Sequence, residues 1–553
     1  MLNAFAFIDI FKYACSVNSA VVYSWAADSV NIIPVYVIET NKMFLILVII
    51  GLVALYFYGT RTFNYWKSRG IKHDKPVPIF GTNLKQFMQK ASMCMMATEM
   101  YNKYPEEKVV GFYRGTDPEL VIRDPEIIKR ILTTDFQCFH SRGLTYHKTC
   151  VEPLLRNIFF ADGDLWRLIR QRFTPAFSTG KLKAMFHIIT DRAEKLQVIT
   201  EEVVDREYYD VRELMARYTT DFIGVCAFGI DMDSLSDENS HFRKLGKRIF
   251  ERRFRDAVAG ALKIMFPELF KHVHFLAPEL EINMKHLVQT VLKNRNYKPS
   301  GRNDFIDLML ELREKGKIIG ESIEHKNPDG TPKIVDLEMD DLLMTAQAFV
   351  FFGAGFETSS TASSYTLHQL AFHPEYQKKV QEEVDTVLAK HNNKLTYDAI
   401  KEMKYLEMAF YESMRMYPSV GYLIRQCCVP KYTFPEIDLT IDDGLKVLIP
   451  IQAIHRDEKY FRDPNKFDPE RFSDGTKEDI KNFVYLPFGE GPRSCVGARL
   501  GQMQSMAGLA AVLQKYSVEP AACSRQEPLP DPAGIVSEGF VGGLPLKIRR
   551  RVK

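Results

Sequence analysis

One cysteine lies in a segment whose composition suits a metal-binding loop. The segment reads FGEGPRSCVGARLGQMQ (residues 488–504), and three glycines surround Cys495. Glycine permits tight turns and a close approach of the backbone to a flat cofactor. The helical pattern that follows places Cys495 near a helix N-terminus, where free N–H groups favour the metal-binding thiolate. Arg493 is placed to neutralise an anionic group beside that metal. The alternative is a buried structural cysteine in a glycine-rich turn.

A second segment, AGFETS (354–359), combines small, acidic and hydroxyl residues. It lies in a proline-free stretch that predicts a long helix from about Asp336 to Phe372, with acidic residues in its first turns. The Ala-Gly pair lets such a helix approach a flat cofactor and open locally. Glu357 and Thr358 offer a proton-carrying acid and a hydroxyl. Taken alone, the string is more typical of a Ser/Thr-rich helix face.

Polar side chains at helical spacing accompany these two segments. In WRLIR, Trp166 and Arg170 are four residues apart, so both lie on one helix face, and both suit a carboxylate partner. In ESMR, Glu412 and Arg415 are three apart and also share a face. PERF adds Arg471. Each alone is typical of core packing (the tryptophan) or of a solvated surface charge (the others).

The cysteine segment resembles the haem-binding segment of the cytochrome P-450 superfamily. FGEGPRSCVG (488–497) matches the family pattern FxxGxRxCxG at every fixed position. The resemblance implies that Cys495 is the proximal thiolate ligand of the iron of haem b, a ligation that favours O–O bond cleavage. It assigns the following residues to haem: Trp166, Arg170, Arg425, Phe488, Arg493 and Cys495.

The other landmarks of the family follow in the expected order. The resemblance implies that Glu357 and Thr358 help to protonate dioxygen. It gives Glu412, Arg415 and Arg471 a structural role in supporting the cysteine loop. It also places residues of the long helix at the substrate pocket, although phenylalanine on a buried helix is more often plain core. These residues are Phe351, Phe352, Ala354 and Phe356.

The resemblance runs from the prolines near Lys75 to the C-terminus and implies a mainly α-helical fold with small β-sheets. Three segments are most similar to microsomal insect members, especially moth enzymes that handle plant toxins and insecticides. Three features depart from the family. The proline segment KPVPIFG (75–81) is shorter than the PPGP-type run, as in insect relatives, Met506 stands where many relatives have lysine, and relatives begin near the position of Met43. The three segments most similar to the insect members are AQAFVFFGAGFETSS, LAFHPEYQKKVQEEV and YLPFGEGPRSCVG.

The activity implied is that of a monooxygenase, which inserts one oxygen atom of O2 into a small apolar substrate. Plant toxins, insecticides and endogenous lipids or hormones are the substrate classes expected from the resemblance. The chain contains no GxGxxG nucleotide-binding motif. Electrons are therefore expected from a separate NADPH-dependent flavoprotein reductase, with a b-type cytochrome as an optional second donor.

Two other functions are compatible with a haem-thiolate segment. A peroxide isomerase or dehydratase works without an electron donor, but such enzymes tend to lack the threonine found here as Thr358. A non-catalytic haem-binding membrane protein is disfavoured by the complete set of proton-delivery and carboxylate-binding residues. Hydrolase chemistry is disfavoured as well, because neither GxSxG nor HExxH occurs.

Composition excludes further classes. The 553 residues are 46% hydrophobic and 26% charged, so the chain can bury a large core. A net charge of +3 is too balanced for a protein that binds nucleic acid with its whole surface. The 9 cysteines contain no CxxC pair, which disfavours a disulfide framework and an ordinary structural zinc site.

A membrane anchor is predicted near the N-terminus. The run from Met43 to Thr60 is uncharged and mostly apolar, at the lower end of the length that crosses a bilayer as a helix. Basic residues gather after it, which places the C-terminal side in the cytosol. No cleavage site follows the run, so an uncleaved signal anchor in the endoplasmic reticulum membrane is expected. A buried core helix is the alternative.

Four parts of the chain are predicted on this basis. They are an N-terminal extension of unknown role (1–42), a transmembrane signal anchor (43–60), a basic linker (61–75) and a haem-thiolate catalytic domain (76–553).

Patterns within the catalytic domain predict individual elements. Basic residues without acidic ones between 165 and 190 form either a patch that steers an acidic partner or a solvated helix face. The predicted elements are helices at 375–391 and 400–417, strands at 119–123 and 445–450, and a surface loop at 324–333.

Overall fold

The computed structural model of the chain contains two compact units, Met1–Arg61 and Thr62–Lys553. It describes most of residues 33–553, so most of the predicted N-terminal extension lies outside the described residues. The positions that are not described are 1–32, 146, 148, 233, 238, 252, 303, 477–479, 481, 535, 536, 538, 553 and the side chains of 33–42.

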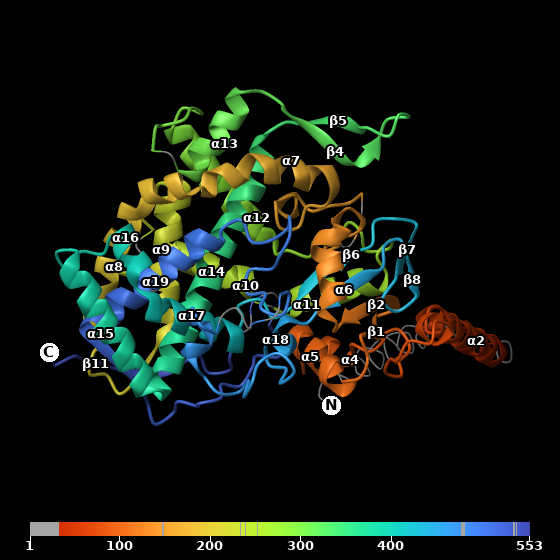
Figure 1. Cartoon of the computed structure of the whole chain (residues 1–553). Coiled ribbons are helices and arrows are strands. Elements are labelled where there is room, and N and C mark those ends of the chain that lie inside the picture. Colours follow the sequence, from red (N-terminus) through yellow and green to blue (C-terminus); the bar gives the residue numbers. More distant parts are fainter. Residues whose placement is uncertain are drawn as a thin grey trace. The chain divides into compact units, whose positions relative to one another are not determined.

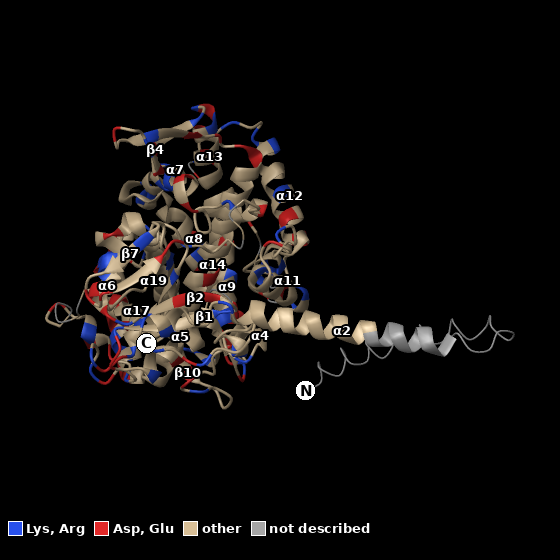
Figure 2. Cartoon of the chain, turned by 90° about the vertical axis from the view of Figure 1, so that its right-hand side faces the viewer, with Lys and Arg blue, Asp and Glu red and all other residues tan. Residues whose placement is uncertain are grey.

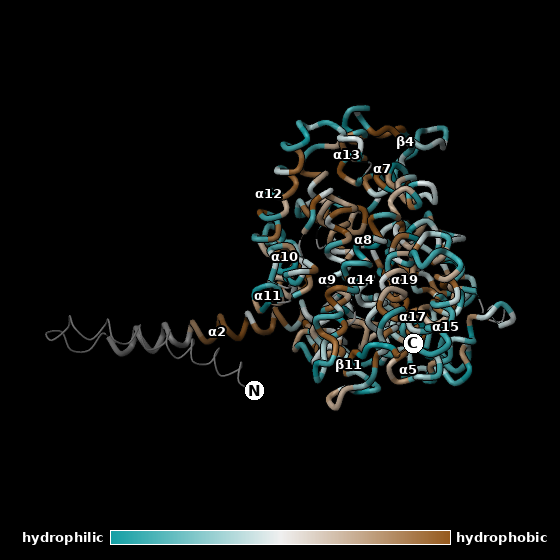
Figure 3. The backbone as a smooth tube through the Cα atoms, turned by 90° about the vertical axis from the view of Figure 1, so that its left-hand side faces the viewer, coloured by the Kyte–Doolittle hydropathy of each residue, from teal (hydrophilic) through white to brown (hydrophobic). Residues whose placement is uncertain are grey.

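The first unit contains helix α2 (Ile33–Thr60), which includes the predicted anchor. The window Met43–Thr60 has a mean hydropathy of 2.3, and only 6% of it is buried. Figure 2 shows no charged residue along this part of α2, and Figure 3 shows its apolar character. The exposed side chains do not fit the alternative of a buried core helix. By length and composition the helix can cross a membrane.

The second unit is mainly helical (Figure 1). The α-helices are α3 (Tyr65–Ser68), α4 (Leu84–Phe87), α5 (Met93–Lys103), α6 (Pro125–Lys129), α7 (Gly163–Phe173), α8 (Thr179–Val203), α9 (Val211–Ile223), α10 (His241–Phe250), α11 (Phe254–Met265), α12 (Pro278–Asn294), α13 (Phe305–Glu314), α14 (Asp341–Phe372), α15 (Pro374–Lys390), α16 (Tyr397–Glu402), α17 (Lys404–Met416), α18 (Ile451–His455) and α19 (Ala498–Lys515). Short 3-10 or π turns are η1 (Arg130–Thr134), η2 (Phe136–Cys138), η3 (Pro153–Leu155), η4 (Thr174–Phe177), η5 (Gly224–Phe228) and η6 (Pro469–Phe472).

The strands form four small sheets, as expected for the fold class. A four-stranded sheet has the order β1-β2-β9-β6, and a three-stranded sheet has the order β10-β11-β3. The pairs β4-β5 and β7-β8 are antiparallel hairpins. The strands are β1 (Val109–Arg114), β2 (Asp117–Ile122), β3 (Tyr209–Asp210), β4 (Ile318–Lys326), β5 (Pro332–Leu337), β6 (Leu423–Gln426), β7 (Lys431–Phe434), β8 (Leu439–Asp442), β9 (Lys446–Ile449), β10 (Tyr516–Pro520) and β11 (Pro545–Arg550).

The long helix α14 begins later than predicted. Asp340 is its N-cap, and its carboxylate accepts a hydrogen bond of 2.6 Å from the N–H of Leu343. The prediction from Asp336 was wrong because the residues up to Leu337 belong to β5. α14 contributes to both of the largest apolar cores, so its middle lies where the two cores meet.

The hairpin β4-β5 replaces the surface loop predicted at 324–333. Its turn lies inside the predicted range, the pairing register shifts between Glu321 and Lys326, and the strands pack over α7. Arg167 forms an ion pair of 3.5 Å with Glu321, and Arg172 donates to the carbonyl of Ile319 at 3.1 Å. The basic face predicted between 165 and 190 is thus partly neutralised by the hairpin.

Three further predictions agree with the structure. The helix at 375–391 is α15, and the strands at 119–123 and 445–450 correspond to β2 and β9. The helix predicted at 400–417 is instead divided at Met403 into α16 and α17.

Candidate functional site

The cysteine loop enters α19 through a set of tight turns. The N–H of Cys495 donates to the carbonyl of Phe488 at 2.9 Å. Gly491 has a φ of +75°, and a Cβ there would lie 1.9 Å from the carbonyl oxygen of Leu132. Only glycine satisfies both the left-handed backbone and this close approach. The sequence pattern of the loop therefore has a steric basis in this chain.

Cys495 faces an internal space. Its side chain is exposed, yet burial is the largest influence on its pKa, which is raised above the ordinary value of 9.0. Protein atoms surround the Cys495 side chain, yet its surface is accessible. We infer that it borders a cavity inside the protein. The N–H of Gly497 and the guanidinium groups of Arg170 and Arg142 lower the pKa of Cys495. The donors expected beside a metal-binding cysteine are present, but burial raises the pKa of Cys495 more than these groups lower it.

Four arginines gather beside this loop: Arg142, Arg170, Arg425 and Arg493, referred to below as the arginine cluster. Arg493 donates to the carbonyl of Ala161 at 2.9 Å and forms an ion pair of 3.0 Å with Asp162. Arg170 donates to the carbonyl of Ser494 at 2.8 Å. These contacts attach α7 and the chain before it to the cysteine loop.

The arginine cluster has more positive charge than its protein partners neutralise. Nη1 of Arg493 and Nε of Arg425 are buried, and neither has a hydrogen-bond partner among the described residues. Burial, followed by the charge of Arg142, lowers the pKa of Arg493 to about 8 and that of Arg425 to about 9. A nearby anion would relieve this destabilisation of the cations.

These observations fit the group that the sequence implies. Haem has two propionate carboxylates, and unpartnered buried guanidinium N–H groups are donors of the kind that carboxylates bind. Trp166 supports the arrangement because its ring lies 4.2 Å from Cζ of Arg493, which is a cation–π contact. Trp166, Arg170, Arg425 and Arg493 therefore lie together beside Cys495, as expected for residues that hold haem.

The acid–alcohol pair lies in the middle of α14. Ala354 is exposed although most of α14 is buried, so this part of the helix also borders an internal space. The hydroxyl of Thr358 donates to the carbonyl of Ala354 at 2.8 Å, and Ser419 donates to the carbonyl of Thr358 at 3.0 Å. α14 is continuous here. The expected local opening of the helix is absent from this described segment.

Glu357 has partners that the sequence did not reveal. Arg212 of α9 binds its carboxylate at 2.6 Å, and the hydroxyl of Ser537 donates to the same oxygen at 2.9 Å. The carboxylate is buried, while Arg212 is partly exposed. Glu357 is thus held by one partly exposed partner, Arg212, and one buried partner, Ser537.

The three charged residues expected to support the cysteine loop form a second, separate group, the support cluster (Glu412, Arg415 and Arg471). Arg415 binds both oxygens of Glu412, at 2.7 and 2.9 Å, and also donates to the carbonyl of His455 at 2.7 Å. Arg471 reaches Glu412 at 3.3 Å. Arg415 and Glu412 are fully buried.

His455 connects the support cluster to the start of the cysteine loop. Its Nε2 accepts the N–H of Leu486 at 2.9 Å, and its Nδ1 lies 3.2 Å from the carbonyl of Arg415. Burial, followed by the charge of Arg415, lowers the pKa of His455 from 6.5 to about 3. The imidazole is therefore neutral, with Nδ1 as the donor. No sequence signal pointed to this histidine.

The phenylalanines expected at the substrate pocket are packed differently from Ala354. Phe352 and Phe356 have no exposed surface and lie in a core cluster. Phe351 stacks on Phe177, with ring centroids 5.6 Å apart, and both line a cavity of about 140 Å³ between α8, α13 and α14. Ala354 alone of the four is exposed.

Sequence reasoning missed Arg142, Asp162, Arg212 and His455. All four act through partners far away in the chain, so local spacing carries no signal for them. Asp162 had the best signal, since it lies four residues before Trp166 and just before α7.

The fold and the site together define a haem-thiolate protein. Comparison with protein families agrees, because a model described as Cytochrome P450 matches residues 72–538. The chain belongs to the cytochrome P450 family.

Relatives among curated proteins include cytochromes P450 of insects. Cytochrome P450 6B2 of Helicoverpa armigera is 41% identical over 473 residues, which cover 85% of this chain and 91% of that protein. Cytochrome P450 6B1 of Papilio polyxenes is 37% identical, covering 86% and 93%. Cytochrome P450 6a2 of Drosophila melanogaster is 37% identical, covering 92% and 99%. The chain is a P450 monooxygenase, an oxidoreductase whose cofactor is haem.

Proposed function

We propose that this chain is a membrane-bound haem-thiolate monooxygenase that inserts one oxygen atom of O2 into small apolar substrates. Plant toxins and insecticides are the main substrate classes, with endogenous lipids or hormones as further ones. NADPH supplies the electrons through a separate flavoprotein reductase, and a b-type cytochrome is a second donor. The catalytic body lies on the cytosolic side of the endoplasmic reticulum membrane.

One observation carries the proposal: the thiol of Cys495 borders an internal space beside two buried arginines, Arg425 and Arg493, that each have an N–H group without a partner among the described residues. Haem bound there would supply dioxygen activation, and Cys495 is the residue positioned to be its axial ligand. The arginine cluster would hold the carboxylates and orient the group, with Arg170 attached to the cysteine loop through Ser494. Burial of these donors excludes water and strengthens each contact.

Proton delivery is assigned to Glu357 and Thr358. The carboxylate of Glu357 accepts hydrogen bonds from Arg212 and from the hydroxyl of Ser537. Once it rotates away from Arg212, it would take up a proton from water and pass it on at the site. The hydroxyl of Thr358 is one rotamer change from the internal space once it leaves the carbonyl of Ala354.

Membrane attachment is assigned to α2. The apolar window Met43–Thr60 can cross a bilayer, and Arg61, Lys67, Arg69, Lys72 and Lys75 follow it. Positive charge on that side favours the cytosol. Removing residues 1–61 should release much of the protein from membranes without loss of the reduced carbon-monoxide spectrum. A truncated protein that stays fully membrane-bound would contradict this assignment.

The decisive experiment uses the full chain with haem, lipid vesicles, an NADPH-dependent P450 reductase and ¹⁸O2. A panel of plant toxins, insecticides and steroids is first screened by the shift of the Soret band. Binders should then give products that contain one ¹⁸O atom and require NADPH. Cys495→Ala should lose haem and product, whereas Cys523→Ala, at an exposed cysteine, should keep both. Turnover of a lipid hydroperoxide without NADPH, and of no other substrate, would favour the isomerase instead.

A further inference from the structure

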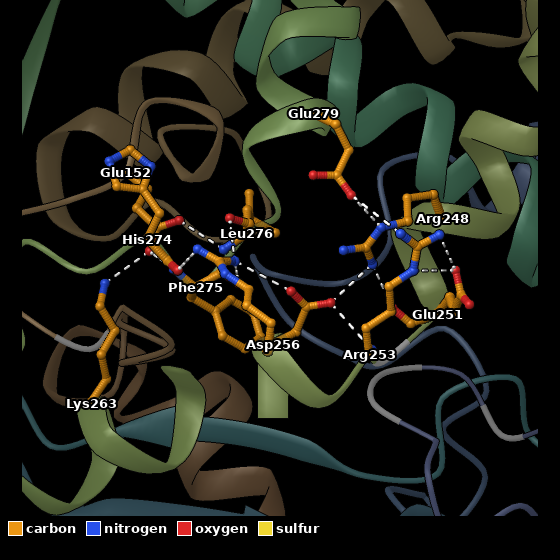
Figure 4. Close-up of polar contacts among 11 residues, drawn as sticks. Glu152, Arg248, Glu251, Arg253, Asp256, Lys263, His274, Phe275, Leu276 and Glu279 are labelled. Atoms are coloured by element: carbon orange, nitrogen blue, oxygen red, sulfur yellow. Dashed lines mark hydrogen bonds and ion pairs between the residues drawn. The ribbon is translucent and has the colours of Figure 1, made fainter. Parts of the chain in front are cut away.

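A dense group of charges lies around Glu152 and Asp256, and protein partners occupy both carboxylates (Figure 4). Glu152 accepts hydrogen bonds from Nζ of Lys263 at 2.8 Å and from the N–H of Leu276 at 2.9 Å. Asp256 forms an ion pair of 2.9 Å with Arg248. A further ligand would have to displace these partners. A cavity is therefore the better candidate for an additional binding site.

The cavity that Phe351 lines has the right size for a small molecule. Its volume is about 140 Å³, and its lining is mostly apolar. An engineered cavity of about 150 Å³, lined by leucine, isoleucine and phenylalanine, stays dry and binds benzene. The cavity is called the side cavity below. The residues that form most of its apolar wall are Phe177, Met185, Ile223, Cys226, Phe351 and Leu500.

The wall of the side cavity suits an aromatic ring. Phe177 and Phe351 lie nearly parallel, with an angle of 11° between the ring planes and 5.6 Å between the centroids. A further ring can pack against their faces or edges, which is more favourable than area burial alone. Met185 and Cys226 add sulfur atoms to the lining, and sulfur also makes favourable contacts with aromatic rings.

The polar residues of the lining favour an uncharged occupant. Asp304 is buried, and Arg295 binds its two oxygens at 2.7 Å each. Burial raises the pKa of Cys226 to about 12, so its thiol is neutral at physiological pH. Lys181 is exposed and Glu311 is partly exposed, which marks the opening of the cavity to the surface. A charged ligand would lose its hydration in the apolar interior, whereas an uncharged ring would not pay this cost.

The side cavity is separate from the haem site. None of its described lining residues is Cys495, Ala354 or a member of the arginine cluster. Ile223 closes the cavity toward the acid–alcohol segment, because a Cβ on Gly355 would lie only 2.5 Å from Cδ1 of Ile223. Such close packing leaves no passage between the two at this point. A molecule in the side cavity is thus held apart from the acid–alcohol segment.

We propose that the side cavity is a second binding site of this protein, which takes neutral monocyclic aromatic molecules while the haem site is occupied. A six-membered ring with one small substituent matches its volume and its aromatic wall. The inference goes beyond the proposed function, because no step of oxygen insertion uses the side cavity. A protein without this second site could still be a monooxygenase, so the two proposals fail separately.

The test uses the full-length ferric holoprotein, with fluorobenzene as the probe. Saturating 4-phenylimidazole first occupies the haem site, and a shift of the Soret band verifies its binding. A titration followed by ¹⁹F NMR should then still show saturable binding of fluorobenzene, whereas partitioning into detergent does not saturate. If saturable binding disappears when 4-phenylimidazole is present, fluorobenzene binds only at the haem site and the proposal is overturned.

Two substitutions change the volume of the side cavity in opposite directions. Ala227→Leu fills the cavity from η5. It should weaken fluorobenzene binding by at least about tenfold, because a closely packed interior cannot hold both the added side chain and the ring. Met185→Ala enlarges the cavity from α8. It should bind 1-fluoronaphthalene at least about tenfold more tightly than the wild-type protein does, since the vacated space accepts the second ring.

Ala184→Leu is the matched control, because Ala184 is exposed on α8 and does not belong to the lining. It should bind both probes as the wild-type protein does. If Ala227→Leu does not retain haem, Leu308→Trp on the α13 side of the cavity and Met185→Ala carry the test. Unchanged binding of both probes in the lining variants, or an equal loss in Ala184→Leu, would overturn the proposal.

Discussion

Two arginine-rich groups are linked to the cysteine loop, and they differ in how completely protein partners occupy their hydrogen-bond donors. In the support cluster, all three guanidinium nitrogens of Arg415 donate to Glu412 or to backbone carbonyls. In the arginine cluster, Nη1 of Arg493 and Nε of Arg425 find no partner among the described residues. Asp162 is the carboxylate that forms an ion pair there.

The difference predicts which of these charges are structural and which bind a ligand. A buried cation that the protein has already paired can only hold the fold, since nothing remains to bind. A buried cation with free N–H groups destabilises the protein until an anion arrives, and the lowered pKa of Arg493 expresses that cost. Residues of the same type, at similar depth, thus have opposite roles.

The largest effect is expected in the support cluster. Arg415→Met removes the two shortest hydrogen bonds of the buried Glu412 and leaves Arg471 at 3.3 Å as its cation. This should lower the free energy of unfolding by about 3–5 kcal/mol. Urea unfolding of the holoprotein measures the change. The double variant Glu412→Gln/Arg415→Met removes both charges and should recover part of the loss. Equal losses in the single and double variants would mean that the ion pair is not the source of the effect.

In the arginine cluster, the same kind of substitution should act on haem instead of on folding. Arg425→Met removes a cation whose Nε is unpartnered, so the haem-free chain should lose little stability or gain some. Haem should dissociate roughly tenfold to a hundredfold faster, the equivalent of one charge-assisted hydrogen bond of about 1.5–3 kcal/mol. Transfer of haem to an excess of apomyoglobin measures this rate. If Arg425→Met lowers the stability of the chain but leaves the rate of haem release unchanged, Arg425 is a structural residue like Arg415.

Asp162→Asn tests the difference between the two clusters by removing the carboxylate that pairs with Arg493. Without bound haem the variant should be less stable by about 2 kcal/mol, because Arg493 loses its anion. With haem bound the loss of stability should be smaller, because the two haem propionates would also neutralise the arginine cluster. Denaturation of both forms measures the difference. An equal loss in the two forms would show that Asp162 and the cofactor do not neutralise the same cations.

The smallest effect is a pH dependence that belongs to the support cluster. The pKa of His455 is about 3 in the folded chain and 6.5 as its ordinary value, so below pH 6.5 the unfolded chain binds a proton that the folded chain does not. The stability from His455 is complete above pH 6.5 and falls as the pH drops, by about 1.4 kcal/mol per pH unit. His455→Asn should remove that slope between pH 6.5 and 5 in urea titrations. A slope that stays the same would assign the acid sensitivity to other groups.

Local patterns predicted the elements and the cofactor loop, but they misplaced boundaries. Cys495, the predominance of helices and the strands β2 and β9 followed from motif spacing and periodicity. The predicted start of α14 was wrong because several acidic residues in this stretch suit a helix start. In the structure Asp340 is the one that caps α14, by accepting the N–H of Leu343. The hairpin β4-β5 was missed because its polar, turn-rich sequence is stabilised by packing on α7.

The amino-acid sequence alone identified the reactive residue types of this protein: a cysteine in a glycine-rich loop, an acid–alcohol pair and a set of arginines. These signals are local, and motif recognition requires only the order of residues. The three-dimensional fold was needed to show which charged side chains have ion-pair or hydrogen-bond partners. It paired Arg415 with Glu412, left Arg425 and Arg493 short of partners, placed Arg212 on Glu357 and joined Glu152 to Lys263. The physical reason is that electrostatic satisfaction depends on distance and burial in space, which residues far apart in the chain acquire only when it folds.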